Sequence, residues 1–416
     1  MKVSRRDFLV VTGVGVTVAT LGFQVMAQGQ NEVLIGSVLP MTGPIAPIGR
    51  TNRQGIELAV EEINAAGGIK ALNGAKLRII DGDHEGKPEK AISETERLIR
   101  QGVHVLFGAY QVASTVPSTQ VAERFKIPYL VPVTAPDIVV ERGFKYVFKV
   151  SPKSSWYARD QVRFLEYIGQ KSGKPIQTVA LLHEATLYGQ TVSKYQREYL
   201  GKSGIKIVAD ISYQTNAPDL TSEIAKLKAA QPGAILATSY ISDAILITKT
   251  MAELQADAGG LVGASAGHID PAYITGLGPM AEYSLTPGEW NPDLKKNGSS
   301  ARNQAINEAF KKRFGVEMNG HAAENYVAVY VLKDALERAK SLDPQKLRDA
   351  LAATDFAGDR NILPYERIVF DATGQNKNAQ LVMLQVQGAS FRTVWPTEYA
   401  SAPAAWPVPR WIERKK

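Results

Sequence analysis

The chain has 416 residues and no cysteine, and its 48 Lys and Arg against 41 Asp and Glu give a formal net charge of +7. The lack of cysteine excludes a disulfide framework, a zinc or iron–sulfur site with cysteine ligands, and a cysteine nucleophile. The apolar fraction of 44% is that of an ordinary globular protein, and at about 150 residues per domain the length predicts two or three domains.

Residues 1–27 have the pattern of an export signal of the twin-arginine type. Arg5 and Arg6 precede an apolar stretch that runs to Val25, and residues 25–27 (Val-Met-Ala) form a small-residue cleavage pattern. An uncleaved membrane anchor is the alternative, but the stretch is short and is diluted by glycine and threonine. No cysteine follows that could carry a lipid, so we expect an exported periplasmic protein that is not a lipoprotein.

The net charge belongs mostly to the two ends of the chain. Residues 1–27 carry +2 and residues 410–416 carry +3, which leaves +2 on the body. This balance gives no reason to expect a nucleic-acid partner. The phosphate-binding motif G-x-x-x-x-G-K-[ST] is absent from the sequence and the five histidines show no metal-ligand spacing, so no cofactor or metal is expected.

The first part of the mature chain alternates buried strands with helices. Strands are predicted at 33–39, 77–81, 103–107 and 129–131, with helices at 56–63, 88–101 and 117–125. Short apolar strands separated by helices are typical of right-handed βαβ units, which form a parallel sheet covered on both faces. One α/β lobe is therefore predicted over residues 33–148.

The alternation starts again after a short crossing at 149–153. Helices are predicted at 155–168, 190–200, 220–230 and 244–256, and strands at 178–183, 205–213 and 234–238. A second crossing is expected at 286–292. After it come helices at 301–314, 322–338 and 344–353 and strands at 367–370 and 381–385. The helix at 322–338 is apolar nearly all round at 326–332, which predicts that it is buried within a lobe.

The sequence thus predicts two Rossmann-like parallel-sheet α/β lobes joined by a multi-strand hinge. The expected divisions are lobe I at 33–148 plus 290–360, lobe II at 152–285 plus 361–395, and a Pro/Trp-rich basic tail at 396–416. We expect Trp395, Trp406 and Trp411 to hold the tail against a lobe. The cleft between two such lobes is the usual place for a ligand.

Several short segments, in order along the chain, carry a resemblance to a known family. They are residues 36–46, 64–69, 77–83, 107–109 and 132–136. With these segments the sequence resembles the type I periplasmic solute-binding proteins of the branched-chain amino acid (leucine, isoleucine, valine) class, which serve ABC importers. The resemblance implies a type I binding fold, a small-molecule carboxylate ligand, an ABC permease partner in the inner membrane and no enzymatic activity. We expect the protein to be a monomer.

The loop at 108–115 is the expected place for the ligand's carboxylate. It joins a strand end to a helix start, where free backbone N–H groups and the positive end of the helix dipole favour an anion. The alternative is that Ser114 and Thr115 only cap their helix. The resemblance assigns carboxylate binding to this loop together with the Thr134 loop. The expected ligand contacts in lobe I are Tyr110, Val112, Ala113, Ser114, Val133 and Thr134.

Aromatic residues in the second lobe are expected to cover the ligand. Tyr188 and Tyr240 stand at strand-to-helix turns and match family positions that close over the ligand, although a tyrosine at a strand end is as often a core or rim residue. Trp156 and Tyr157, together with Tyr110 of the first lobe, could stack on an aromatic ligand.

Ser265 is a departure from the family pattern. Amino-acid binders of this class usually have an acidic residue at this place to pair with the ligand's ammonium group, because an unpaired buried cation is costly. We therefore favour a ligand without an ammonium group, an aromatic or 2-keto acid. Glu184 or Glu324 could restore the missing charge, so a hydrophobic amino acid is the alternative.

Two other functions fit parts of the sequence. Residues 263–267 fit G-x-S-x-G, the nucleophile elbow of serine hydrolases, with Ser265 as nucleophile. The next helix, however, is expected to start later, at Pro271 with Asp270 as its N-cap, and His268 is too close in sequence to be the usual base. A ligand-sensing receptor of the same fold is the second alternative to a transport function.

Overall fold

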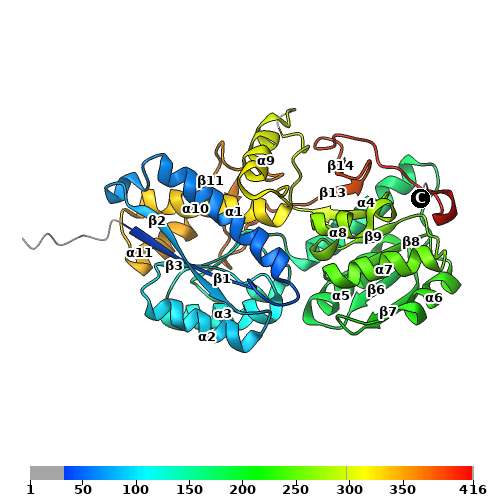
Figure 1. Ribbon diagram of the computed structural model, residues 1–416, viewed down its shortest axis with the longest axis horizontal. Helices are drawn as coiled ribbons and strands as arrows, with labels where there is room; N and C mark the ends of the chain where they lie inside the picture. Colours follow the sequence, from blue (N-terminus) through cyan, green and yellow to red (C-terminus); the bar gives the residue numbers. More distant parts are fainter. Residues whose placement is uncertain (1–31, 297, 415–416) are drawn as a thin grey trace, which may run out of the picture.

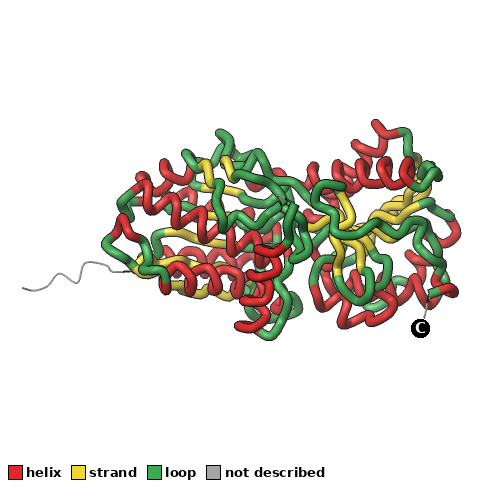
Figure 2. Tube along the Cα trace, turned by 90° about the horizontal axis from the view of Figure 1, so that it is seen from above, coloured by secondary structure: helices red, strands yellow, loops and turns green. Residues whose placement is uncertain are grey.

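The computed structural model describes residues 32–296 and 298–414, and it contains two α/β lobes side by side (Figure 1). Seen from above, loops join the two bodies near the middle of the molecule (Figure 2). This arrangement confirms the predicted fold class of two lobes and a hinge. The expected export signal at 1–27 lies outside the described residues. Within the described ranges, the structure has no helix with the length and apolar character that crossing a membrane requires.

The first lobe is built on a five-stranded parallel sheet in the order β2-β1-β3-β4-β5. Its strands are β1 (Glu32–Leu39), β2 (Lys76–Asp83), β3 (Val105–Gly108), β4 (Tyr129–Val131) and β5 (Val147–Lys149). Its helices are α1 (Ala46–Ala65), α2 (Pro88–Arg100), α3 (Val112–Phe125), α9 (Ala301–Phe314), α10 (Gly320–Ala339) and α11 (Pro344–Ala352).

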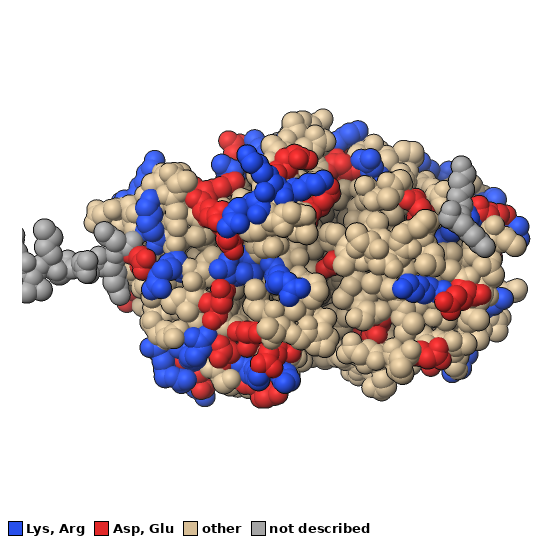
Figure 3. Space-filling model, in the orientation of Figure 1, with Lys and Arg blue, Asp and Glu red and all other residues tan. Residues whose placement is uncertain are grey.

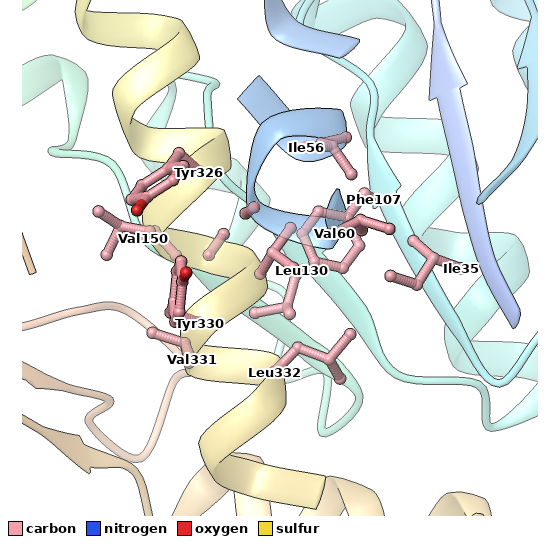
Figure 4. Close-up of a cluster of buried hydrophobic side chains, with 14 of the residues drawn as sticks. Ile35, Ile56, Val60, Phe107, Leu130, Val150, Tyr326, Tyr330, Val331 and Leu332 are labelled. Carbon is pink, nitrogen blue, oxygen red and sulfur yellow. The ribbon is translucent and has the colours of Figure 1, made fainter. Parts of the chain in front are cut away.

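Helix α10 packs beside α1 in the core of the first lobe (Figure 4). Every residue from Tyr326 to Leu332 is buried, as the apolar sequence of this stretch predicts. Ile56 and Val60 of α1 and Phe107 of β3 face it in the same cluster. Burying one such aliphatic or aromatic side chain stabilises the fold by about 1.5–3 kcal/mol, so the buried residues of α10 contribute substantially to the stability of this lobe.

The second lobe contains a seven-stranded sheet in the order β14-β13-β10-β9-β8-β6-β7. Its strands are β6 (Thr178–Glu184), β7 (Lys206–Tyr213), β8 (Ala234–Thr238), β9 (Leu261–Gly263), β10 (Leu285–Gly288), β13 (Val382–Val386) and β14 (Phe391–Trp395). Its helices are α4 (Ser154–Lys171), α5 (Leu187–Ser203), α6 (Thr221–Ala230), α7 (Ile241–Glu253) and α8 (Pro271–Leu277). The sheet is mixed, not purely parallel as expected, because β13 and β14 add an antiparallel hairpin beside β10.

Within the described residues the chain crosses between the lobes three times, at 150–153, 289–296 and 380–381. The last crossing differs from the expected boundary at residue 360. Residues 355–356 and 368–369 pair as β11 (Asp355–Phe356) and β12 (Ile368–Val369), and Ile362, Leu363 and Ala379 belong to the first lobe's core. The segment 361–379 therefore stays with lobe I, because its strand pairs with β11 and not with the sheet of lobe II.

Helix α3 begins five residues earlier than expected, at Val112 instead of Pro117. The carbonyl of Gln111 accepts the N–H groups of Ser114 and Thr115 at 3.1 and 2.8 Å, which starts the helix ahead of the proline. Pro117 lies inside the helix and removes only one bond of its ladder. Val112 in the first turn of α3 therefore lines the space between the lobes together with Tyr110 of the preceding loop.

The basic tail lies against lobe II, as expected from its tryptophans. Trp406 packs on the core of that lobe, and the ring lies so close to Gly260 that a Cβ there would be 2.3 Å from it. Trp411 is buried, and its indole N–H donates to the carbonyl of Ala256 at 3.1 Å.

Charged side chains on the face shown in Figure 3 are mixed in sign over lobe I. Two of the ion pairs of this lobe join α1 to its neighbours: Arg313 to Glu61 at 2.9 Å and Arg53 to Asp81 at 2.6 Å.

Candidate functional site

A cavity lies between the two lobes, near the start of α3 on one side and of α5 on the other. These two helices contact each other across the junction. The volume of the cavity is about 30 Å³, room for roughly two water molecules. A larger ligand therefore requires the lobes or the lining side chains to move apart. Lobe I contributes Tyr110, Val112, Val133, Thr134, Ala135 and His321 to the lining, and lobe II contributes Tyr157, Tyr188, Tyr240, Ala264, Ser265 and Ala266.

The first turn of α3 forms part of the lobe I wall. Its N-cap residue Gln111 is extended, with φ −70° and ψ 138°, and the helix begins at Val112, which lines the cavity. The N–H groups of Val112 and Ala113 are in the first turn, where no intrahelical acceptor exists. Thr134 ties the neighbouring loop to this turn, since its hydroxyl lies 3.0 Å from both the Tyr110 carbonyl and the Thr115 hydroxyl.

Four residues expected at the ligand lie outside the cavity lining. Ala113 is exposed, and Ser114 is fully buried with its hydroxyl 3.4 Å from His84 Nδ1, behind the wall. Trp156 is half-buried under the guanidinium of Arg159. Glu324 is buried in α10, and burial raises its pKa well above the ordinary value, with the charge of Glu289 adding to the shift.

Three tyrosines pack together at the cavity. The rings of Tyr188 and Tyr240 lie 5.5 Å apart, and Tyr110 of lobe I meets Tyr240 edge-on at 6.3 Å. The Tyr188 hydroxyl donates to the carbonyl of Ala264, which fixes the ring over the loop after β9. The structure thus brings together eight of the twelve expected residues: Tyr110, Val112, Val133, Thr134, Tyr157, Tyr188, Tyr240 and Ser265.

Gly267 sets the distance between the loop after β9 and the start of α7. A Cβ at this position would lie 2.4 Å from the carbonyl carbon of Tyr240, and the Gly267 N–H donates to the Ser239 carbonyl at 3.2 Å. Only glycine permits this approach. The close contact positions Ser265 and Tyr240 on the same wall.

No motif or spacing in the sequence indicates the polar cluster behind Ser265. The Ser265 hydroxyl donates to Glu289 Oε1 at 2.8 Å, and the Tyr157 hydroxyl donates to the same oxygen. His321 Nε2 lies 3.4 Å from Ser265 Oγ and 3.9 Å from Glu289 Oε2. A carboxylate therefore stands next to position 265 after all, so the reason for expecting a ligand without an ammonium group does not hold.

The backbone and side chains around Ser265 can be compared with the nucleophile elbow and triad that a serine hydrolase requires. Ser265 has the strained backbone angles φ 63° and ψ −131°, and a 3-10 turn (Ala266–His268) follows at once, so the local backbone is closer to an elbow than expected. Helix α8 starts at Pro271 with an Asp270 cap, as predicted. A triad needs the acid on the second ring nitrogen of the base. Here serine and acid approach the same nitrogen of His321, and Nδ1 has no partner among the described residues.

Lys149 is the last residue of β5, directly before the first crossing. Its ammonium donates to the carbonyls of Ser151, at 2.8 Å, and of Pro152, and Gln375 of lobe I donates to the same Ser151 carbonyl at 2.9 Å. Burial lowers the pKa of Lys149 to about 7, against the smaller opposing effect of nearby Asp137 and Glu324. The hinge carbonyls are thus held by a buried lysine.

Comparison with known proteins gives one family. Residues 32–390 match the family model described as periplasmic binding protein. A relative from Brucella melitensis biotype 1, named Leu/Ile/Val-binding protein homolog 7, is 30% identical over 389 residues, which cover 89% of this chain and 93% of the relative.

Solved structures share the fold. A branched-chain amino acid transporter substrate binding protein of Streptococcus pneumoniae, in complex with isoleucine, superposes with a TM-score of 0.75 at 23% identity, covering 86% of this chain and 97% of that one. A solute binding protein of an ABC transporter from R. palustris, in complex with benzoate, gives 0.73 at 20% identity, covering 90% and 97%. At this identity the likeness establishes the fold, and the two ligands differ in that one is an amino acid and the other is not.

Proposed function

The chain belongs to the periplasmic binding protein family, and we propose that it is the solute-binding component of an ABC importer of the branched-chain or hydrophobic amino acid class. Its ligand is a small carboxylate, an aromatic or keto acid or a hydrophobic amino acid, bound between the lobes. The observation that carries this proposal is the cavity lined by both lobes, with a helix start on one wall and tyrosines on the other. Such a receptor has no catalytic step.

The ligand's carboxylate binds at the first turn of α3. Among the described residues, the first-turn N–H groups of Val112 and Ala113 have no hydrogen-bond acceptor, and together with the helix dipole they favour a negative charge at this point. Tyr188 and Tyr240 then cover the ligand from lobe II. Because the lining comes from both lobes, binding favours the closed arrangement, which a membrane permease recognises.

The protein acts in the periplasm. It is exported by the twin-arginine signal at 1–27 and carries no lipid anchor. It acts as a monomer, since one pair of lobes forms one cavity. Release of a leader ending at Ala27 is tested by N-terminal sequencing of the exported protein, and the monomer by sedimentation.

A proline substitution at the first residue of α3 tests the carboxylate site. Val112→Pro removes one N–H donor, yet proline suits the first helical position and the extended Gln111 suits the residue before it. We expect Val112→Pro to weaken binding of carboxylate ligands at least tenfold in titration calorimetry, whereas Val112→Ala, which keeps the N–H, weakens it far less. Equal affinities of the two variants would contradict carboxylate binding at this turn.

The ligand itself is sought in the protein as purified. Mass spectrometry of the small molecules released by denaturation identifies a co-purified ligand, and thermal-shift screening ranks carboxylates. A serine hydrolase using Ser265 predicts instead ester turnover that Ser265→Ala abolishes, and a ligand-sensing receptor predicts binding without uptake by an importer.

A further inference from the structure

A second cavity lies beside the second crossing and is called the hinge cavity below. Its volume is about 400 Å³, the size of a small-molecule site, whereas the cavity near the starts of α3 and α5 (the α3 cavity) has about 30 Å³. Its walls come from α9 and residues 317–320 of lobe I, from α8 and the β13–β14 hairpin of lobe II, and from residues 290–293 of the crossing itself. In Figure 1, α9 and β14 lie near the top of the view, and α3 and α5 lie lower.

The hinge cavity is separate from the α3 cavity. Among the described residues the two share no lining residue. The wall between them passes through the start of α10, where Gly320 lines the hinge cavity and His321 lines the α3 cavity. This wall is tightly packed, since a Cβ on Gly320 would lie 3.0 Å from Ile269 Cδ1. The two cavities can therefore be filled independently.

Two buried N–H donors belong to residues that line the hinge cavity. Trp290 is 1% exposed and Asn319 is 5% exposed, and neither Trp290 Nε1 nor Asn319 Nδ2 has a hydrogen-bond partner in the described part of the chain. The Asn319 amide is oriented by its cap of α10, because its Oδ1 accepts the Ala322 N–H at 2.9 Å. A buried donor without an acceptor is costly, so both groups favour a ligand that brings an acceptor oxygen.

The charged residues of the lining favour an anionic acceptor. Arg392 of β14 is exposed and lines the cavity. The two acidic residues of the lining are engaged by other side chains: Glu317 pairs with Lys311 at 3.1 Å, and Asp293 accepts the Thr393 hydroxyl at 2.6 Å. Arg392 is thus the charged group available to a ligand, and a guanidinium binds a carboxylate through two parallel hydrogen bonds.

Much of the remaining lining is apolar and comes from both lobes and the crossing. Its members are Ile269, Pro271, Ile274, Pro292, Met318, Leu384 and Phe391. We propose that the hinge cavity is a second small-molecule site, and that its ligand is an organic acid with an apolar body. The carboxylate accepts from Arg392, Trp290 and Asn319, and the apolar body packs on the aliphatic and aromatic side chains. This site does not depend on what the α3 cavity binds.

A matched pair of probes tests the site. The probes are 1-naphthylacetate and its uncharged analogue 1-naphthylacetamide, titrated by calorimetry into protein stripped of ligand by unfolding and refolding. We expect the acid to bind at least tenfold more tightly than the amide. Should the acid also bind at α3, the titration resolves two sites, and Val112→Pro should weaken only the other one.

Three variants locate the acid. Thr275→Trp places a large ring in the hinge cavity from an exposed position of α8 and should abolish binding there. Asn319→Asp keeps the helix cap but replaces the N–H donor by an acceptor, and Arg392→Gln removes the charge, so each should weaken the acid at least tenfold. Arg100→Gln, at an exposed position of α2, makes the same charge change elsewhere and should bind like the wild type.

The proposal is overturned if the wild type binds no acid in the millimolar range, or if Thr275→Trp binds it as the wild type does. Equal affinities for acid and amide, or unchanged affinities in both Asn319→Asp and Arg392→Gln, overturn the recognition of a carboxylate. If Asn319→Asp does not fold, Thr275→Trp and Arg392→Gln decide the matter, because both positions are exposed.

Discussion

Replacement of Lys149 by methionine should change how the stability of the protein depends on pH. Burial lowers the pKa of this lysine to about 7 from 10.5. Between these two values the unfolded chain holds a proton that the folded chain has released, so the free energy of unfolding rises with pH. The slope is about 1.4 kcal/mol per pH unit, or about 3 kcal/mol between pH 7.5 and 9.5.

Urea denaturation followed by tryptophan fluorescence measures this slope. Lys149→Met also loses the bonds to the Ser151 and Pro152 carbonyls, but that cost is the same at every pH. The difference in unfolding free energy, wild type minus variant, should therefore grow by about 1.4 kcal/mol per unit above pH 7. The exposed Lys312 provides the control, because Lys312→Met should run parallel to the wild type. Parallel curves for Lys149→Met would refute the reasoning.

Two further substitutions test the packing that supports the site. Gly267→Ala places a Cβ 2.4 Å from the Tyr240 carbonyl carbon and should destabilise the protein by about 1–3 kcal/mol. The control Gly201→Ala lies in open space on helix α5 and should stabilise the protein by about 0.5–1 kcal/mol. The midpoints of urea denaturation compare the two variants. Trp411→Ala removes a buried ring and its hydrogen bond to the Ala256 carbonyl. We expect the free energy of unfolding to fall by about 2–4 kcal/mol and proteolysis of the tail to become faster. An unchanged cleavage rate would show that Trp411 does not anchor the tail.

Local signals in the sequence were enough for most of the elements. Asp270 before Pro271 combines a cap with a residue suited to the first helical position, and α8 starts there. The apolar stretch at 326–332 predicts a buried helix because it offers no polar face, and α10 is buried. Such signals act over one or two turns and need no knowledge of the partner.

The features that the sequence did not disclose depend on distant partners. Segment 361–379 has the same strand pattern whichever lobe it joins, and only its pairing with β11 decides. Glu289 and His321 stand 24 and 56 residues from Ser265, with no fixed spacing that would connect them. Ser114 was expected at the ligand because it lies in the right loop, but helix α3 turns it toward His84. Successive side chains at the start of a helix point in different directions. A helix that begins at a different residue than expected therefore turns different side chains toward the cavity.

The position of α10 in the chain has a consequence for synthesis. This helix fills the core of lobe I, yet it is made after the whole stretch from α4 to β10 of lobe II. A ribosome that has just completed β10 has released every strand of the first sheet but not the helix that covers α1. The nascent first lobe therefore exposes an apolar face while the parallel strands of the second lobe are already complete, and chaperone binding to nascent chains should concentrate on that face until residue 339 emerges.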